Sequence, residues 1–189
     1  MLDDGKLRER YEQNLSELES MVQSTLDFLR GIDTGETARA LDVMARVESL
    51  QADLQETGAR VTVEGTTDRP YVGQRQALRR CLGNLLDNAI QYGGEARIVV
   101  ADSDAQLAIH VRDTGPGIPP DQIEKVFKPF YCIEGSRNRE TGGTGLGLVI
   151  ARQIARAHGG DVTLANLAGG GLEARLVLPR SRNPTDGSY

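Results

Sequence analysis

The chain has 189 residues, of which 39% are apolar and 26% charged, which is enough for one domain with a packed core and excludes wholesale disorder. The formal net charge of −5 and the lack of a basic tract argue against a nucleic-acid-binding protein, because phosphate contacts require clustered Lys and Arg. Apolar stretches reach only four residues, too few to cross a bilayer, and the mostly polar residues 1–14 predict no signal peptide.

The first predicted element is a helix over residues 6–30, which contain no Gly or Pro. Residues at spacings of three and four form a heptad seam there, as in helices that pack against other helices. The seam consists of Leu15, Leu18, Val22, Thr25 and Leu29. The pattern predicts a partner helix from another chain or from sequence outside these residues, with packing onto the chain's own domain as the alternative.

A linker at residues 31–35 leads into the remaining elements. These are a helix over 41–54 closed by Gly58, a strand over 60–64, a helix over 74–92, a hairpin of 96–101 and 106–113, a short helical piece at 121–127, a helix over 144–158, and a hairpin of 161–166 and 172–178 that turns at 169–171. Because helices mix with mostly antiparallel strands in no regular alternation, the predicted class is α+β. Residues 181–189 are expected to form a disordered tail.

The helix over residues 74–92 has two faces that differ in character. Its apolar face is predicted to enter the core and consists of Leu78, Leu82, Leu85 and Ala89. Beside it, Asn84, Asn88 and Gln91 form a compact amide face, although Asn disfavours helix interiors. Amide oxygens can ligate a hard cation such as Mg²⁺. A solvated polar face is the alternative.

A second cluster, Asp113-Thr-Gly-Pro-Gly-Ile118, directly follows a predicted strand. A carboxylate at a strand end can accept a hydrogen bond from an exocyclic amine, and glycines let the backbone approach a flat ligand. An ordinary turn would explain the same residues.

A third cluster, Gly142-Gly-Thr-Gly-Leu-Gly-Leu148, opens the helix over residues 144–158. Glycines at a helix N-terminus expose N–H groups at the positive end of the helix dipole, which favours phosphate. The segment matches neither the P-loop nor the GxGxxG motif, so it is weak evidence when taken alone.

Taken together and in order, four segments resemble the N, G1, F and G2 boxes of sensor histidine kinases. They are Asn84-Leu-Leu-Asp-Asn88, Asp113-Thr-Gly-Pro-Gly117, Phe127-Lys-Pro-Phe130 and Gly143-Thr-Gly-Leu-Gly147. The resemblance implies a Bergerat-type fold, a two-layer α/β sandwich with a mixed, mostly antiparallel sheet of about five strands and three helices on one face. It assigns residues 1–32 to the second helix of a dimerisation hairpin and residues 33–180 to an ATP-binding catalytic domain.

The resemblance also implies a site for ATP or ADP with Mg²⁺. Asn88 would ligate the metal with Asn84 beside it as the second catalytic residue, and Asp113 would bind the adenine amine. Further nucleotide contacts would come from Gln91, Tyr92, Gly115, Gly117, Ile118, Phe127, Phe130, Arg137, Arg139, Gly143, Thr144, Gly145, Leu146 and Gly147. Residues 128–141 would form a mobile lid anchored by the two phenylalanines. Its arginines would either reach the γ-phosphate or remain solvated.

Two residues depart from the family pattern. Gln91 stands where many relatives carry a basic residue, and Cys132 stands where Arg is frequent. Each change removes an expected phosphate contact, so weaker ATP binding is our hypothesis. Cys81 and Cys132 form no CxxC motif and are predicted to be free thiols in a reducing compartment.

Neither of the two histidines matches the acceptor histidine of the family. His110 is predicted to lie on the solvent side of a strand, opposite the apolar residues. His158 precedes Gly159-Gly160 and fits a helix C-cap with a favourable dipole interaction. We therefore expect the acceptor helix to lie outside this chain, which would be part of a longer kinase.

The implied function is transfer of the ATP γ-phosphoryl group to a histidine of the dimerisation helix and onward to a response-regulator receiver domain. The whole protein would be a homodimer anchored in the bacterial inner membrane. This chain would be cytoplasmic, without nucleic-acid or membrane contact, and alone would bind ATP without autophosphorylation. The alternatives are a nucleotide-dependent binding module, or an ATPase of the wider fold family. Asn84 disfavours the ATPase, because relatives that hydrolyse ATP carry Glu there.

Overall fold

The computed structural model describes residues 35–133 and 144–180, together with eight helical residues nearer the N-terminus. These eight are Arg8, Tyr11, Glu12, Leu15, Glu19, Val22, Thr25 and Leu26. Their conformation agrees with the predicted helix over residues 6–30. Four apolar or aromatic side chains among them are exposed, from 41% for Leu26 to 63% for Tyr11. The described part of the chain therefore leaves much of the apolar surface of this helix uncovered.

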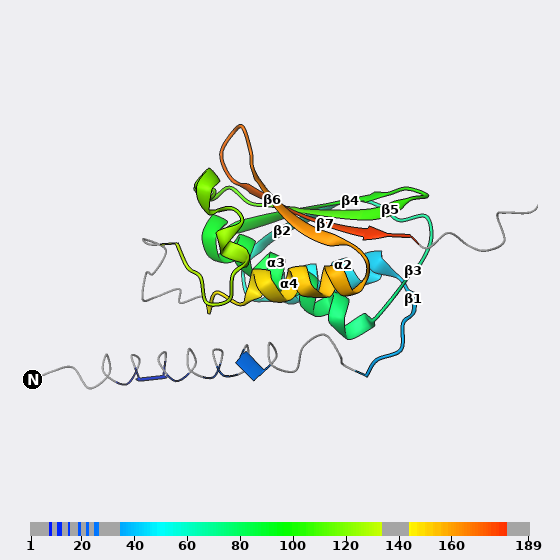
Figure 1. Cartoon of the computed structure of the whole chain (residues 1–189), viewed down its shortest axis with the longest axis horizontal. Helices are drawn as coiled ribbons and strands as arrows, with labels where there is room; N and C mark the ends of the chain where they lie inside the picture. The colour runs from blue at the N-terminus through cyan, green and yellow to red at the C-terminus, as the bar shows by residue number, and fades with distance from the viewer. Residues whose placement is uncertain are drawn as a thin grey trace, which may run out of the picture.

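A five-stranded mixed sheet forms one layer of the molecule (Figure 1). In spatial order, the strands are β2 (Arg60–Gly65), β4 (Glu95–Asp102), β5 (Gln106–Arg112), β7 (Leu172–Pro179) and β6 (Asp161–Asn166). Strands β2 and β4 are parallel and the other neighbours are antiparallel. A separate antiparallel pair joins β1 (Arg39–Leu41) to β3 (Tyr71–Gly73). The predicted α+β class and mixed five-stranded sheet are confirmed.

Three helices form the second layer and cover one face of the sheet, as predicted (Figure 1). They are α2 (Val43–Glu56), α3 (Arg75–Gly93) and α4 (Gly147–Ala157). Helix α2 begins where the Asp42 carboxylate accepts a hydrogen bond of 3.0 Å from the Ala45 N–H. Helix α3 ends at Gly94, whose φ of 74° lies in the left-handed region that glycine adopts without strain.

The hydrophobic core lies between the two layers. Alternate side chains of each strand enter it because successive residues of a strand point to opposite faces. The most deeply buried strand residues, at most 1% exposed, include Leu107, Ile109, Val111, Leu176 and Leu178. The predicted apolar face of α3 meets them, and Leu78, Leu82, Leu85 and Ala89 are all buried. Burial of each large side chain stabilises the fold by roughly 1.5–3 kcal/mol, which fixes the rotation of α3 about its axis.

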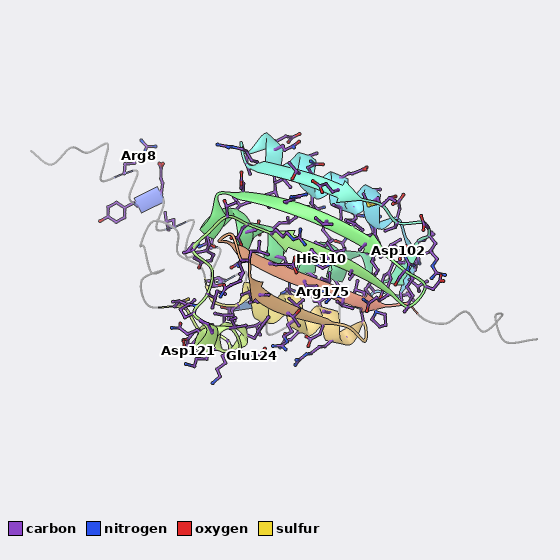
Figure 2. The ribbon with its side chains drawn as sticks, turned by 90° about the horizontal axis from the view of Figure 1, so that it is seen from above. Arg8, Asp102, His110, Asp121, Glu124 and Arg175 are labelled. Atoms are coloured by element: carbon purple, nitrogen blue, oxygen red, sulfur yellow. The ribbon has the colours of Figure 1, made fainter. Side chains whose placement is uncertain are left out.

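The other face of the sheet carries His110 and Arg175, and no helix of residues 35–133 or 144–180 covers it (Figure 2). The Nδ1 atom of His110 lies 3.2 Å from Glu173 Oε1, while Arg112 Nε donates to Glu173 Oε2 at 2.6 Å. Burial by itself would raise the pKa of Glu173, but the hydrogen bond from Arg112 and the nearby His110 ring outweigh it and hold the pKa below its ordinary value. His110 lies opposite the apolar residues as predicted, although its side chain is only 18% exposed.

His158 is the C-cap of α4, as predicted. Its Nδ1 lies 2.8 Å from the Ile154 carbonyl oxygen, and its Nε2 accepts a hydrogen bond of 3.1 Å from the Gln74 N–H. Because Nε2 accepts, this geometry requires the neutral tautomer with the proton on Nδ1. The ring thus caps α4 by donating to a carbonyl group.

The structure differs from the predicted elements at the start of α4 and at two short strands. Helix α4 begins at Gly147 and not at residue 144, because Gly145 has a φ of 67° that no α-helix contains. The predicted short helical piece near residues 121–127 is confirmed, and it consists of two 3₁₀ helices, η1 (Pro120–Gln122) and η2 (Lys125–Phe127). Strands β1 and β3 were not predicted.

The predicted tail at residues 181–189 lies outside the described residues. No helix in the described part of the chain has the length and apolar character that crossing a bilayer requires.

Candidate functional site

Asp113 follows β5 directly and is 7% exposed. Its Oδ1 accepts hydrogen bonds from the Gly115 N–H at 2.8 Å and the Leu172 N–H at 3.2 Å. Its own N–H donates to the Leu172 carbonyl at 3.0 Å, which extends the β5–β7 pairing by one residue. None of the described residues donates a hydrogen bond to Oδ2. The structure therefore fixes the carboxylate through one oxygen and leaves the other as an acceptor for a ligand.

Two glycines allow the end of α3 to lie against this carboxylate. A Cβ atom at Gly93 would be 2.5 Å from the Cβ of Asp113, and one at Gly115 would be 2.7 Å from the Tyr92 carbonyl oxygen. The Thr114 hydroxyl also donates to the Gly93 carbonyl at 3.1 Å. These contacts bring the backbone of Tyr92 beside the Asp113 loop. The structure thus joins two of the predicted clusters at the C-terminal end of α3.

The amide face of α3 lies next to the N-terminus of α4. Asn84, Asn88 and Gln91 are all half-buried. A Cβ atom at Gly147 would be 3.4 Å from Asn84 Oδ1, so the first residue of α4 lies directly against this amide. The third predicted cluster thereby meets the first. Carboxamide oxygens beside a helix N-terminus suit a hard cation that shares a phosphate with that helix.

The N-terminus of α4 lacks a side-chain cap among the residues that the structure describes, and Leu146 is its N-cap residue. The first N–H groups of an α-helix have no partner within the helix and lie at the positive end of its dipole. Leu146 itself is fully buried, and its N–H donates to the Thr144 hydroxyl at 3.4 Å. The buried side chain of Leu146 thus anchors the segment from Thr144 to Gly147 in the core.

The segment from Phe127 to Tyr131 leads toward the predicted lid. Phe127 is half-buried and packs against the core, as expected for an anchor. The ring of Phe130 is 62% exposed, so the prediction that this side chain anchors the segment was wrong. Its backbone does the anchoring, because the Phe130 N–H donates to the Gly145 carbonyl at 3.1 Å. Tyr131 is the second side-chain anchor: it packs against the core and donates its hydroxyl to Gln122 Oε1 at 3.2 Å.

Arg152 of α4 connects three segments around this anchor. Its guanidinium group lies 4.2 Å from the ring centroid of Phe127 and forms ion pairs of 2.9 Å with both Glu124 and Asp161. Burial would raise the pKa of Asp161, but hydrogen bonds from Arg152 and Arg156 hold it at about 2. Helix α4, whose N-terminus contains the predicted phosphate-binding segment, is therefore tied to the residues that lead toward the predicted lid.

Asn166, at the end of β6, is a residue near the site that the sequence analysis missed. Its Oδ1 accepts from the Ile118 N–H at 2.8 Å, and its Nδ2 donates to the Ile118 carbonyl at 2.7 Å. The available signal was a polar residue that ends a strand immediately before a glycine-rich turn. Ile118 itself is 8% exposed, so its side chain belongs to the core.

Some expected features lie elsewhere or outside the described residues. Arg137, Arg139 and Gly143 fall in the residues that the structure does not describe. In the described part of the chain, no group of three or more His, Cys, Asp or Glu residues could hold a metal ion.

Cys81 is fully buried with its thiol 3.4 Å from the Ala151 carbonyl, and burial raises the pKa of this thiol to about 12. Cys81 is therefore an inert core residue, and no disulfide joins Cys81 to Cys132, as predicted.

Comparison with known families gives one clear match. Residues 73–182 match the model of the histidine kinase-, DNA gyrase B- and HSP90-like ATPases. Curated relatives include the sensor histidine kinase GtrS of Pseudomonas aeruginosa, 39% identical over 95% of this chain, and the histidine-protein kinase BaeS of Escherichia coli, 39% identical over 59% of it. The chain spans only 37% and 24% of the length of these two relatives.

Solved structures share the fold. The catalytic domain of the histidine kinase ThkA, in a nucleotide-free form, superposes with a TM-score of 0.65 at 25% identity, covering 77% of this chain and 99% of that domain. Full-length ShkA in complex with AMPPNP gives a TM-score of 0.73 at 23% identity over 88% of this chain and 36% of ShkA, which supports the fold alone.

Proposed function

Since the chain belongs to the histidine kinase-, DNA gyrase B- and HSP90-like ATPase family and contains an ATP-binding catalytic domain of the sensor histidine kinase type, we propose that it transfers the γ-phosphoryl group of ATP to a histidine on an acceptor helix. From there the phosphoryl group would pass to an aspartate of a response-regulator receiver domain. The observation that carries the proposal is the buried Asp113, with one oxygen held by two backbone N–H groups and the other without a donor among the described residues.

Adenine recognition would take place at the second oxygen of Asp113. A carboxylate accepts only, so it selects a base with an exocyclic amine over one with a carbonyl group at the same place. Its position is set before the ligand arrives, because Leu172 and Gly115 already occupy Oδ1. Such preorganisation reduces the entropy lost on binding. Tyr92, 37% exposed and next to the glycines that admit Asp113, would pack near the base.

The phosphates would lie at the N-terminus of α4, with Mg²⁺ at the amide face of α3. Asn88 would ligate the ion and Asn84 would lie beside it, as the contact between Asn84 and Gly147 supports. Mg²⁺ commonly keeps waters and substrate phosphates as its remaining ligands, which suits a site with few protein ligands. When bound, the ion offsets phosphate charge, while the protein supplies positioning.

The acceptor histidine would come from outside the described site. Both ring nitrogens of His158 lie within hydrogen-bond distance of backbone groups, and His110 lies against Glu173 on the sheet face opposite the helices. The chain has no third histidine. In this proposal the exposed side chains of the N-terminal helix, such as Tyr11 and Leu15, pair with the acceptor helix and with a second copy of the protein. A membrane anchor in the whole protein is part of the proposal and rests on the family resemblance alone.

The test is transfer of label from [γ-³²P]ATP to a separately purified dimerisation hairpin that carries an acceptor histidine. We expect acid-labile, base-stable label on the hairpin, none when its histidine is replaced by Gln, and much less with the Asn88→Ala form of this chain. ATP binding without any transfer would instead favour a nucleotide-dependent binding module. Failure to bind ATP would contradict the proposed function altogether.

A further inference from the structure

The loop of residues 113–118 is closed at both ends by the β6–β7 hairpin. At its start, the backbone N–H of Asp113 donates to the Leu172 carbonyl, and the Leu172 N–H donates to the Asp113 carboxylate. At its other end, the Asn166 side chain bonds the backbone of Ile118. Asn166 and Leu172 face each other across the hairpin as paired residues. One cross-strand pair thus holds the loop that carries the proposed adenine-binding carboxylate.

Both the oxygen and the nitrogen of the Asn166 amide form hydrogen bonds with the backbone of Ile118. Its oxygen accepts from the Ile118 N–H at 2.8 Å while its nitrogen donates to the Ile118 carbonyl at 2.7 Å, so the side chain replaces the strand partner that Ile118 lacks. The residue itself is exposed, so its contribution to the core is small. The loss of this side chain would therefore release the loop without leaving a cavity.

Gly117 gives independent evidence that this contact shapes the loop. Its φ is 73°, and a Cβ atom there would lie 2.5 Å from Asn166 Oδ1 and 3.5 Å from the Gly171 carbonyl oxygen. The second glycine of the motif is thus required by the approach of the Asn166 amide as well as by its own backbone conformation. A side chain at residue 117 would push the amide away from Ile118.

We infer that Asn166 is a positioning residue of the nucleotide site, which fixes the far end of the 113–118 loop so that Asp113 and Gly115 keep their binding geometry. The inference rests on the proposed function, because it assumes that this loop binds the adenine base. Asn166 does not touch the nucleotide. It disfavours loop conformations that cannot bind nucleotide. The apparent affinity equals the intrinsic affinity multiplied by the fraction of molecules in which the loop is competent to bind.

The experiment compares Asn166→Ala and Asn166→Asp with Thr163→Ala, an exposed residue of the same strand that serves as the matched control. Calorimetry with ATP and with ADP should show about tenfold weaker binding for Asn166→Ala, because both hydrogen bonds to Ile118 are lost. The Asp form retains the acceptor for Ile118 but places a second acceptor against its carbonyl, so it should be no better than Ala. The ratio of ATP to ADP affinity should remain unchanged, since the phosphate-binding segment at Thr144–Gly147 is not involved.

Two further readouts separate positioning from general stability. In the nucleotide-free protein, amide exchange at Ile118 should accelerate in both Asn166 variants, while the thermal midpoint should match that of Thr163→Ala. Gly117→Ala should weaken ATP binding less in the Asn166→Ala background than in the unaltered chain, because the Cβ then meets no amide.

The outcomes are distinct from those that test the function. If the unaltered chain binds no nucleotide, the proposed function fails, and exchange at Ile118 alone decides whether Asn166 fixes the loop. If the unaltered chain binds ATP and the Asn166 variants bind it equally well, the inference is overturned while the function stands. Equal exchange rates at Ile118 in all forms would overturn the inference as well.

Discussion

At the scale of single residues, Asp161 shows how paired charges outweigh burial. It lies at the start of β6, and Arg152 and Arg156 of α4 both donate to it. With a folded-state pKa of about 2 against an ordinary 3.8, the carboxylate stabilises the fold fully above about pH 4. That stabilisation is lost as the pH falls from about 4 to about 2, where the folded protein must also take up the proton.

We therefore expect Asp161→Asn to unfold at a lower urea concentration than the unaltered chain at pH 7. The difference should shrink below pH 4 and vanish near pH 2, because only the unaltered chain loses a charge there. Asp121→Asn is the matched control: its i,i+4 pair with Lys125 is largely exposed and contributes a few tenths of a kcal/mol at most. A stability difference for Asp161→Asn that is the same at pH 7 and pH 2.5 would show that the ion pairs are not its source.

At the scale of elements, an ion pair joins three segments at the end of the sheet remote from the proposed nucleotide site. Arg180, directly after β7, donates to both carboxylate oxygens of Asp102 at 2.7 Å and to the Pro70 and Arg69 carbonyls. The two side chains are only 6% and 5% exposed. Burial would raise the pKa of Asp102, but the Arg180 hydrogen bonds hold it below its ordinary value. Figure 2 shows Asp102 at one end of the molecule and Asp121 and Glu124 at the other.

Arg180→Met should destabilise the fold by about 3–5 kcal/mol, because it leaves the buried Asp102 carboxylate without its partner. The double variant Arg180→Met/Asp102→Asn should recover part of that loss, since it buries no charge. Chemical denaturation measures both, and nucleotide affinity of the folded fraction should stay unchanged at this distance from Asp113. Equal stability of the single and double variants would contradict a role for the uncompensated charge.

The elements that could be predicted from sequence are those with enough residues to show a period. Helix α3, with its apolar face and its amide face, and the two hairpins were predicted within about two residues. Strands β1 and β3 have three residues each, too few for alternation to be visible, and they form only because distant segments pair. The start of α4 was misplaced because the Gly145 turn depends on its contact with Phe130.

Within the candidate site, the residues that could be predicted are likewise those that belong to a local sequence pattern. Asp113, Asn84 and the glycine-rich segment were predicted because each has a local motif that fits its chemistry. The role of Asn166 was not, because its partner Ile118 lies 48 residues earlier in the chain, and no local pattern reports such a contact. The position of Phe130 was predicted wrongly because its φ of 63° could not be inferred from the residue type. With this backbone conformation its ring is exposed, whereas the neighbouring Tyr131 packs against the core.

At the scale of the whole molecule, we expect the domain to bind ATP without hydrolysing it. The amide face has Asn84 where relatives that hydrolyse ATP carry a Glu base, and a carboxamide cannot take a proton from water. We expect phosphate release from Mg²⁺-ATP by the purified chain to be indistinguishable from that of a Asn88→Ala control. Steady release well above that control would show an ATPase and contradict this view of the site.

The most direct test of the account is calorimetric titration of the chain and of Asp113→Asn with ATP and ADP, each with and without Mg²⁺. We predict one saturable site in the unaltered chain, tighter binding of ATP with Mg²⁺, and an affinity for nucleotide at least tenfold lower in the variant. That loss follows because the amide would place a donor where the adenine amine needs an acceptor, or would surrender the backbone bonds that hold residue 113. Equal binding by both proteins, or no binding by the unaltered chain, would contradict the claim that Asp113 marks a nucleotide site.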